Sequence, residues 1–169
     1  MFKSSLEKLK STKYLTLLAL FIALKVVVGY FRFPIADQLY ISFTFIVTAI
    51  ESCILGPVGA IVSGAITDTV DFMMNPHPPY FPGYAISSMA GGFIYAMCFY
   101  NKKIRLRNII VAKSLVNVLV NIGLGCTWKA MLYSKGYLYY LATSLPKNLI
   151  LLPLEIFILY FAFKVISLS

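Results

Sequence analysis

"YLTLLALFIALKVVVGYF" (Tyr14–Phe31) is an almost unbroken apolar run of about the length that a helix needs to cross a bilayer. The chain of 169 residues is 60% hydrophobic and 12% charged, with a mean hydropathy of +0.82. An ordinary soluble domain is less apolar and carries about twice that share of charge. Lysines precede the run as in a signal peptide, but no small-residue cleavage site follows it and further apolar runs do, which favours a retained first span. The sequence therefore predicts an all-α integral membrane protein.

Proline, glycine and charged residues divide the rest of the chain into further apolar runs, and no separate soluble domain is visible. We expect one membrane-embedded domain over residues 1–169 with about six transmembrane helices. Because the second ends at Leu55-Gly56-Pro57, we expect the turn into the third within the depth of the membrane, covered by protein. Since the last contains Pro146 and Pro153, we expect a loop or short helix before the final span. The predicted spans run from Tyr14 to Phe31, Ser42 to Leu55, Val58 to Met74, Gly83 to Tyr100, Asn108 to Leu132 and Tyr137 to Ile166.

Basic residues give the expected orientation. The formal net charge is +9, and the lysines and arginines gather mainly before the first span and in residues 102–107. The positive-inside rule places both groups, and both termini, in the cytoplasm. This explains the charge without a nucleic-acid partner, and we expect a multi-pass protein of the cell (cytoplasmic) membrane.

Acidic residues inside the spans are the first candidates for function. Asp68 and Asp71 lie three residues apart on one face of the third predicted span, in its outer half. Such groups usually face a bundle interior or a cavity, so they indicate a small-molecule site open to the outside. In the alternative reading, one of them caps a helix or pairs with Lys25 or Lys129. Glu155 in the last span is open to both a ligand role and an ion pair or hydrogen bond with a neighbouring helix.

The outer connection "NPHPPYFPGY" (Asn75–Tyr84) holds four prolines. They exclude helix and stiffen the segment, which presents Tyr80, Phe81 and Tyr84 at low entropic cost. Rigid aromatic rings above buried carboxylates suit a flat, hydrogen-bonding ligand. An interfacial aromatic belt on a stiff connector is the alternative, and the same two readings apply to Trp128.

Signs of catalysis or metal binding are missing from the sequence. Cys53, Cys98 and Cys126 lie in apolar runs without ligand spacing, and His77 has no partner at metal-ligand spacing. There is no phosphate-cradling glycine loop, no GxSxG and no HExxH. We therefore expect no metal, no cofactor and no enzymatic activity, so any active transport would draw energy from a partner or an ion gradient.

A pair of alanines and a set of motifs follow one another over nearly the whole chain: Ala19 and Ala23, "ISFTFI" (Ile41–Ile46), "LGPVGAIVSGAITD" (Leu55–Asp68), "YFPGY" (Tyr80–Tyr84), "GGFIYAMCFY" (Gly91–Tyr100) and "KNLILLPLE" (Lys147–Glu155). This ordered set resembles the substrate-binding S components of energy-coupling factor (ECF) vitamin transporters, and among them the folate-specific ones. The resemblance implies the six-helix S-component fold and a subunit that captures folate, or a closely related vitamin, from outside with high affinity.

The resemblance also implies partners. The chain would dock on an ECF module made of a transmembrane T subunit and two ATPases, with Ala19 and Ala23 facing the T subunit. The whole S component would topple in the membrane and deliver the vitamin inward. ATP hydrolysis would belong to the partner ATPases, so this chain would not be an enzyme.

By the same resemblance, Asp68 is the carboxylate that accepts the amino and ring N–H donors of a pterin. The remaining substrate-binding candidates are Ser42 and Phe43 before the second span, Phe81 and Tyr84 in the outer loop, Trp128, and Lys147 and Asn148 in the last span. A cation at Lys147 would hold the glutamate tail of the ligand, and simple solvation of Lys147 at the outer surface is the alternative.

Two other classes of function stay open. An ion-coupled secondary transporter of a small polar solute would use Asp68, Asp71 and Glu155 as a proton relay and would work alone. An intramembrane enzyme would require Asp68 and Asp71 to supply acid–base or metal chemistry, but no other catalytic motif accompanies them.

Overall fold

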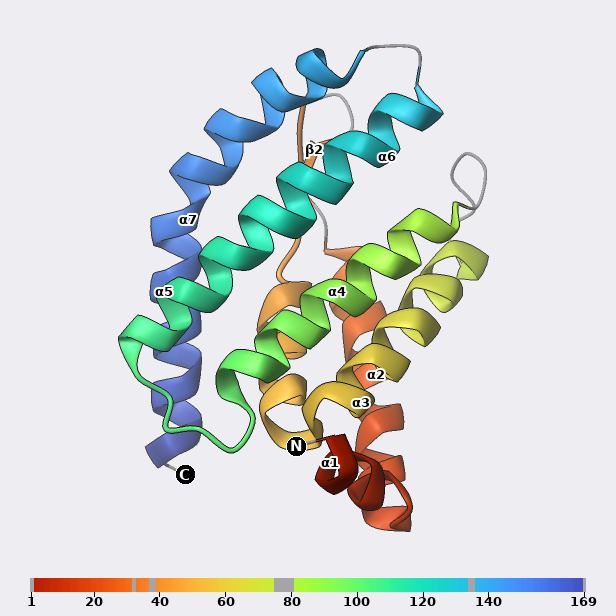
Figure 1. Ribbon diagram of the computed structural model, residues 1–169, viewed down its shortest axis with the longest axis vertical. Coiled ribbons are helices and arrows are strands. Elements are labelled where there is room, and N and C mark those ends of the chain that lie inside the picture. Colours follow the sequence, from red (N-terminus) through yellow and green to blue (C-terminus); the bar gives the residue numbers. More distant parts are fainter. Residues whose placement is uncertain (1, 32, 37–38, 75–80, 134–135, 169) are drawn as a thin grey trace. The chain divides into compact units, whose positions relative to one another are not determined.

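The computed structural model describes residues 2–31, 33–36, 39–74, 81–133 and 136–168 (Figure 1). The chain forms two compact units, Met1–Asn101 and Lys102–Ser169. Residues 75–80 of the outer loop, among them His77 and Tyr80, lie outside the described residues. The prediction of one domain over residues 1–169 stays a prediction.

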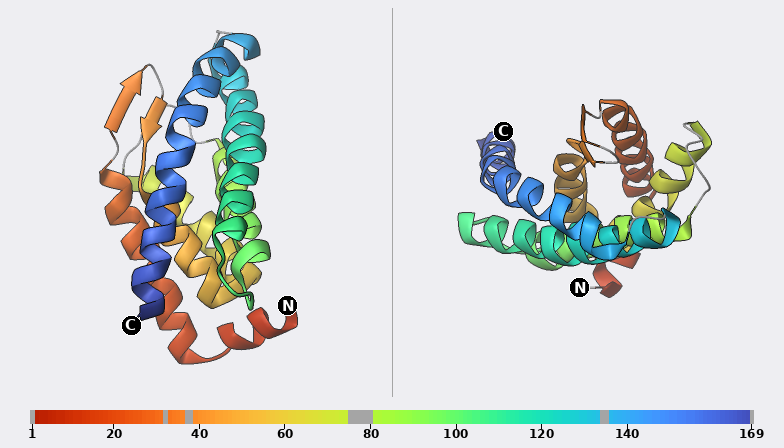
Figure 2. Two further views of the ribbon diagram at one scale, coloured as in Figure 1. Left: turned by 90° about the vertical axis from the view of Figure 1, so that its left-hand side faces the viewer. Right: turned by 90° about the horizontal axis from the view of Figure 1, so that it is seen from above.

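The first unit consists of helices and one short hairpin. Its two strands pair antiparallel, with Phe33 opposite Ile41. This hairpin was not expected from the sequence, and it lies at the opposite end of α2 from α1 (Figure 2). The elements are α1 (Phe2–Leu9), α2 (Thr12–Tyr30), β1 (Phe33–Ala36), β2 (Leu39–Ile41), α3 (Thr44–Met74) and α4 (Pro82–Phe99).

Helix α3 is broken in its middle and doubles back (Figure 1). Gly56 has a φ of 78°, a left-handed conformation that glycine adopts without a steric penalty, and Pro57 follows it with no N–H to donate. Leu55, Gly56 and Pro57 are all buried. The prediction of a protein-covered turn between the second and third spans is therefore confirmed.

Small residues set the packing of the second half of α3 against α4. A Cβ added at Gly64 would come within 2.9 Å of the Ser88 backbone, and one added at Gly92 within 3.0 Å of the Ala60 carbonyl oxygen. The Ser52 hydroxyl donates to the Gly92 carbonyl at 3.1 Å. Such close backbone approach is a common means of joining helices in lipid, where the hydrophobic effect gives little attraction between them.

The second unit contains two long helical segments that lie side by side (Figure 1). The first is continuous through α5 (Leu106–Leu115), the π-helix η1 (Val116–Leu124) and α6 (Gly125–Leu132), and the second is α7 (Tyr137–Leu168). Pro146 and Pro153 both lie inside α7, so the expected loop or short helix before the final span was wrong. Each proline removes only one backbone hydrogen bond, and in lipid an interrupted helix would leave many more groups without partners.

Four helical stretches of the described chain are long and apolar enough to cross a membrane: Thr12–Tyr30, Thr44–Met74, Leu106–Leu132 and Tyr137–Ile166. The second and third predicted spans fall on the two halves of α3, and the fourth falls on α4. The all-α membrane class and the six predicted helical segments are thus confirmed.

Candidate functional site

The pairing of α3 with α4 places Asp68 relative to the aromatic residues of the outer loop. The two helices run antiparallel, with Ala60 against Gly92 and Gly64 against Ser88. One further turn along this register brings Asp68 to the level of Tyr84. Asp68 and Tyr84 are both half-buried. The structure therefore brings this carboxylate and this aromatic ring to the same end of the α3–α4 pair.

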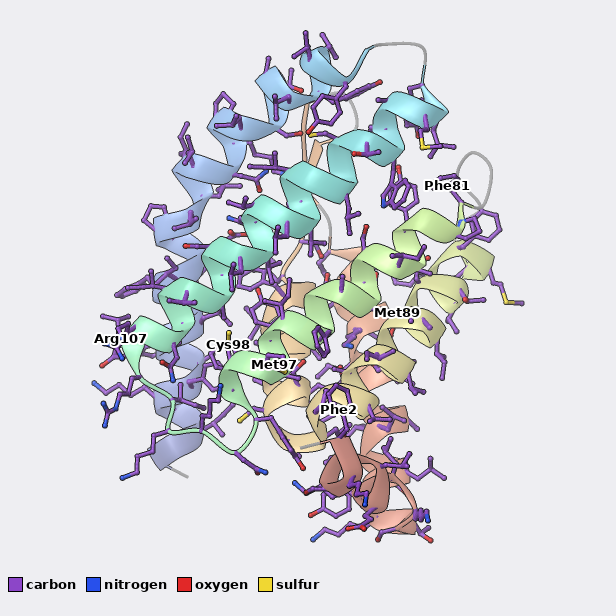
Figure 3. All side chains as sticks on the ribbon, viewed as in Figure 1. Phe2, Phe81, Met89, Met97, Cys98 and Arg107 are labelled. Atoms are coloured by element: carbon purple, nitrogen blue, oxygen red, sulfur yellow. The ribbon has the colours of Figure 1, made fainter. Side chains whose placement is uncertain are left out.

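Phe81 and Tyr84 form a rigid aromatic pair at the start of α4. Phe81 is the N-cap residue, with an extended backbone, and the Tyr84 N–H donates to the Phe81 carbonyl at 3.1 Å. The two rings meet edge to face, with centroids 6.2 Å apart and planes at 80°. Figure 3 shows Phe81 at this end of α4. Both side chains are half-buried.

Ser42 and Phe43 immediately precede α3. The Ser42 hydroxyl accepts the Thr44 N–H at 3.3 Å and also bonds to the Thr44 hydroxyl, an arrangement that begins the helix. Thr44 and Asp68 lie the same number of residues from the break at Gly56. Because α3 doubles back there, the start of α3 lies on the same side of the break as Asp68 (Figure 1).

A buried ion pair that sequence reasoning missed lies deeper in this unit. Lys25 of α2 pairs with Glu51 in the first half of α3, and its Nζ donates to the Ser63 hydroxyl in the second half at 2.7 Å. Lys25 is 3% exposed, and Glu51 and Ser63 are fully buried. The pair therefore ties α2 to both halves of α3. A lysine and a glutamate in neighbouring apolar runs could have suggested this ion pair. From the sequence, Lys25 was considered only as a partner for Asp68 or Asp71.

The candidates from the last two predicted spans belong to the second unit. Trp128 on α6 and Lys147 on α7 are half-buried. Asn148 is buried, and its side-chain amide donates to the Ser144 carbonyl at 2.9 Å. Part of the hydrogen-bonding capacity of Asn148 is thus used within α7.

Further polar groups lie along the same helix pair. The Lys113 ammonium of α5 lies 3.2 Å from a Glu155 carboxylate oxygen of α7, with exposed fractions of 2% and 15%. Of the two readings left open for Glu155, the ion pair is the one observed. Asn117 of η1 is buried and accepts a hydrogen bond from the Asn121 amide at 2.8 Å. A π-helix often marks a functional segment, and nothing in the apolar pattern of this run predicted it.

Ala19 and Ala23 lie one turn apart on α2 and are both exposed, next to the exposed Leu20 and Leu24. They form an outward stripe of small residues of the kind that lets another helix approach closely. Among the described residues, no group of three His, Cys, Asp or Glu side chains is placed to hold a metal ion.

Residues 13–163 match the family described as "ECF transporter, substrate-specific component". A relative in Clostridium novyi (strain NT), named folate transporter FolT, is 30% identical over 159 residues, covering 94% of this chain and 92% of the relative. A relative of the same name in Leuconostoc mesenteroides is 27% identical over 157 residues, covering 89% and 84%. A solved structure, the crystal structure of FolT bound with folic acid, superposes with a TM-score of 0.83 at 31% identity, covering 89% of this chain and 92% of that one.

The family match extends from the start of α2 almost to the end of α7, so it includes every predicted site residue in both units. The likeness to the solved structure, at 31% identity, extends beyond fold to sequence. This chain therefore belongs to the family of substrate-specific components of ECF transporters and is a multi-pass, substrate-binding membrane subunit.

Proposed function

We propose that this chain binds folate, or a closely related vitamin, from outside the cytoplasmic membrane with high affinity. The observation that carries the proposal is its likeness, over about nine-tenths of both chains, to a FolT whose crystal structure contains folic acid. The curated relatives named folate transporter support the same ligand.

The pterin would bind in the first unit. Asp68 offers a carboxylate at the level of Tyr84, where it accepts hydrogen bonds from the amino group and a ring N–H of the pterin. Bonds to an ionised acceptor are shorter and stronger than neutral ones, and their geometry distinguishes a pterin from a ring without adjacent donors. Phe81 and Tyr84 supply the aromatic faces that a flat ring system packs against. Ser42 and Phe43 complete this set.

Lys147 and Asn148 are the candidates for the glutamate tail of the ligand. The Lys147 ammonium attracts the carboxylates of the glutamate moiety, and Asn148 donates a further hydrogen bond. Trp128 offers a large aromatic ring that a flat ring system can pack against. Lys147 is half-buried on α7.

Delivery would require partners. With both termini in the cytoplasm, the chain docks on an ECF module of a transmembrane T subunit and two ATPases, and topples to release the vitamin inside. The exposed Ala19 and Ala23 on α2 support a helix-packing contact with the T subunit. The chain itself performs no catalysis.

The test is titration of the purified, detergent-solubilised chain with folic acid while the fluorescence of Trp128, the only tryptophan, is recorded. We expect saturable quenching at nanomolar concentrations, with thiamin, riboflavin and pantothenate as controls and with correction for absorption by the ligand. Binding of another vitamin in place of folate would show that folate is not the ligand of this chain. If fluorescence responds to none of them, isothermal calorimetry with the same ligands decides, and a lack of heat from folic acid would overturn the proposal.

A further inference from the structure

Two polar side chains of α1, Ser5 and Lys8, face the break in α3. Ser5 is fully buried at the break in α3, where its hydroxyl donates to the Leu55 carbonyl at 2.6 Å and accepts the Val58 N–H at 3.2 Å. The Lys8 ammonium donates to the Ile54 carbonyl at 3.3 Å and lies 4.7 Å from the centroid of the Tyr100 ring. The inner face of α1 thus caps backbone groups that the break leaves without helical partners.

Two large apolar side chains of α1 are exposed, whereas Leu9 is half-buried and packs against the core of the first unit. Phe2 and Leu6 lie one helical turn apart and are 51% and 52% exposed. Phe2 stacks on Phe93 of α4, with ring centroids 6.1 Å apart, and still leaves half of its surface uncovered (Figure 3). The exposed side of α1 thus combines these two apolar side chains with the charged Lys3 and Glu7. An exposed face that combines large apolar side chains with lysine suits the boundary between water and lipid.

The lysines near α1 fall into two groups. Lys8 is half-buried and is engaged with the protein, whereas Lys3, Lys10 and Lys13 are exposed. Glu7 is the only acid in residues 2–13. Residues 2–13 therefore carry three exposed lysines against one acidic residue, and this excess of positive charge complements an anionic surface.

The direction of α1 matches that of a helix lying on a bilayer. Helix α2 is long and apolar enough to cross the membrane, and α1 runs crosswise to it at the end of the unit remote from the β1–β2 hairpin (Figure 2). A helix placed across the end of a span lies parallel to the membrane surface, where an apolar face enters the boundary between headgroups and acyl chains while lysines meet the headgroups.

We propose that α1 is a lipid-binding element. Phe2 and Leu6 insert into the headgroup–acyl boundary, and Lys3, Lys10 and Lys13 bind the phosphates of anionic phospholipids. The capping bonds of Ser5 and Lys8 hold α1 at the depth of the break in α3. This role is independent of which vitamin the chain binds.

The test uses spin labels at two adjacent positions, Leu6→Cys and Glu7→Cys, in the full chain with its three native cysteines replaced by serine. Each labelled chain is placed in nanodiscs of phosphatidylcholine alone or of phosphatidylcholine with phosphatidylglycerol. Collision rates with oxygen, which concentrates in lipid, and with a water-soluble nickel chelate report the surroundings of each label. We expect the Leu6 label to meet oxygen and the Glu7 label to meet nickel, with the Leu6 label deeper in the anionic nanodiscs.

The charge requirement is tested with Lys3→Gln/Lys10→Gln/Lys13→Gln, which should abolish the added depth in anionic nanodiscs. Lys102→Gln/Lys103→Gln/Arg105→Gln removes the same charge from another exposed segment and should leave the Leu6 label unmoved. Thermal unfolding of each variant checks that it is folded. A Leu6 label that meets nickel freely, or that is shielded from both reagents by protein, would overturn the proposal, and a depth independent of phosphatidylglycerol would refute the binding of anionic headgroups.

Discussion

Asp68 and Asp71 differ in what their loss should do, although both are half-buried acids on the second half of α3. Asp68→Asn keeps the volume of the side chain and removes its charge, so a charge-assisted bond to the pterin is lost. We expect an affinity loss of about 1.5–3 kcal/mol, roughly ten- to a hundredfold in Kd for folic acid. Isothermal calorimetry measures it, with Asp71→Asn as the matched control that should stay within a few fold. Equal affinities for Asp68→Asn and the wild-type chain would remove Asp68 from the pterin site.

The buried Lys25–Glu51 pair gives a prediction about stability. Lys25→Met leaves the Glu51 carboxylate in the protein interior without its counter-charge, which costs about 3–5 kcal/mol in other buried pairs. We expect a clear fall in the thermal unfolding midpoint of the detergent-solubilised chain. The double variant Lys25→Met/Glu51→Leu removes both charges and should recover most of the loss. A double variant as unstable as the single one would show that the pair is not the source of the effect.

Sequence reasoning can select individual residues as candidates more readily than it can identify their partners. Asp68, Phe81 and Tyr84 could be chosen because residue type, spacing and the proline-rich loop mark them locally. Glu51 could not be chosen as the partner of Lys25 from the sequence. This pairing depends on how α2 packs against the two halves of α3, which no short-range pattern encodes. The Ser5 cap on the α3 break was missed for the same reason.

At the scale of elements, the exposed alanines of α2 give a prediction about assembly with the T subunit. Ala19→Leu/Ala23→Leu fills the exposed stripe of small side chains, which keeps a partner helix at a greater distance. We expect binding of folic acid to be unchanged and copurification with the T subunit to be lost. Ala19→Ser/Ala23→Ser keeps the side chains small and should copurify normally. If the leucine variant still assembles, α2 does not present this stripe to the T subunit.

The helices themselves were largely predictable, and the exceptions have physical causes. The lengths of the apolar runs predicted α2 and the long helices of the second unit. The Gly56-Pro57 pair correctly predicted the break in α3. The prolines of α7 misled because the helix continues through them where lipid offers no other hydrogen-bond partner. The hydropathy pattern did not predict the π-helix η1 or the β1–β2 hairpin, because both depend more on backbone hydrogen bonding than on residue type.

At the scale of the whole molecule, the proposed mechanism predicts how uptake is energised. Cells that contain this chain without a T subunit and ATPases should bind radiolabelled folate without accumulating it, and accumulation should appear when a compatible ECF module is coexpressed. Dissipating the proton gradient while ATP is maintained should leave uptake intact. Gradient-dependent accumulation by the chain alone would instead favour a secondary transporter in which Asp68 and Asp71 carry protons.

The contact between Lys25 and Glu51 also bears on how the protein enters the bilayer during synthesis. A lone lysine at the centre of a span costs about 2.5–3.5 kcal/mol on insertion, and a lone carboxylate carries a similar penalty. Neither α2 nor the first half of α3 is thus an ideal segment for release into lipid by itself. Because each holds the counter-ion of the other, the favourable path is for the translocon to retain α2 until Glu51 has been synthesised, and for the two helices to leave it together as a neutralised pair.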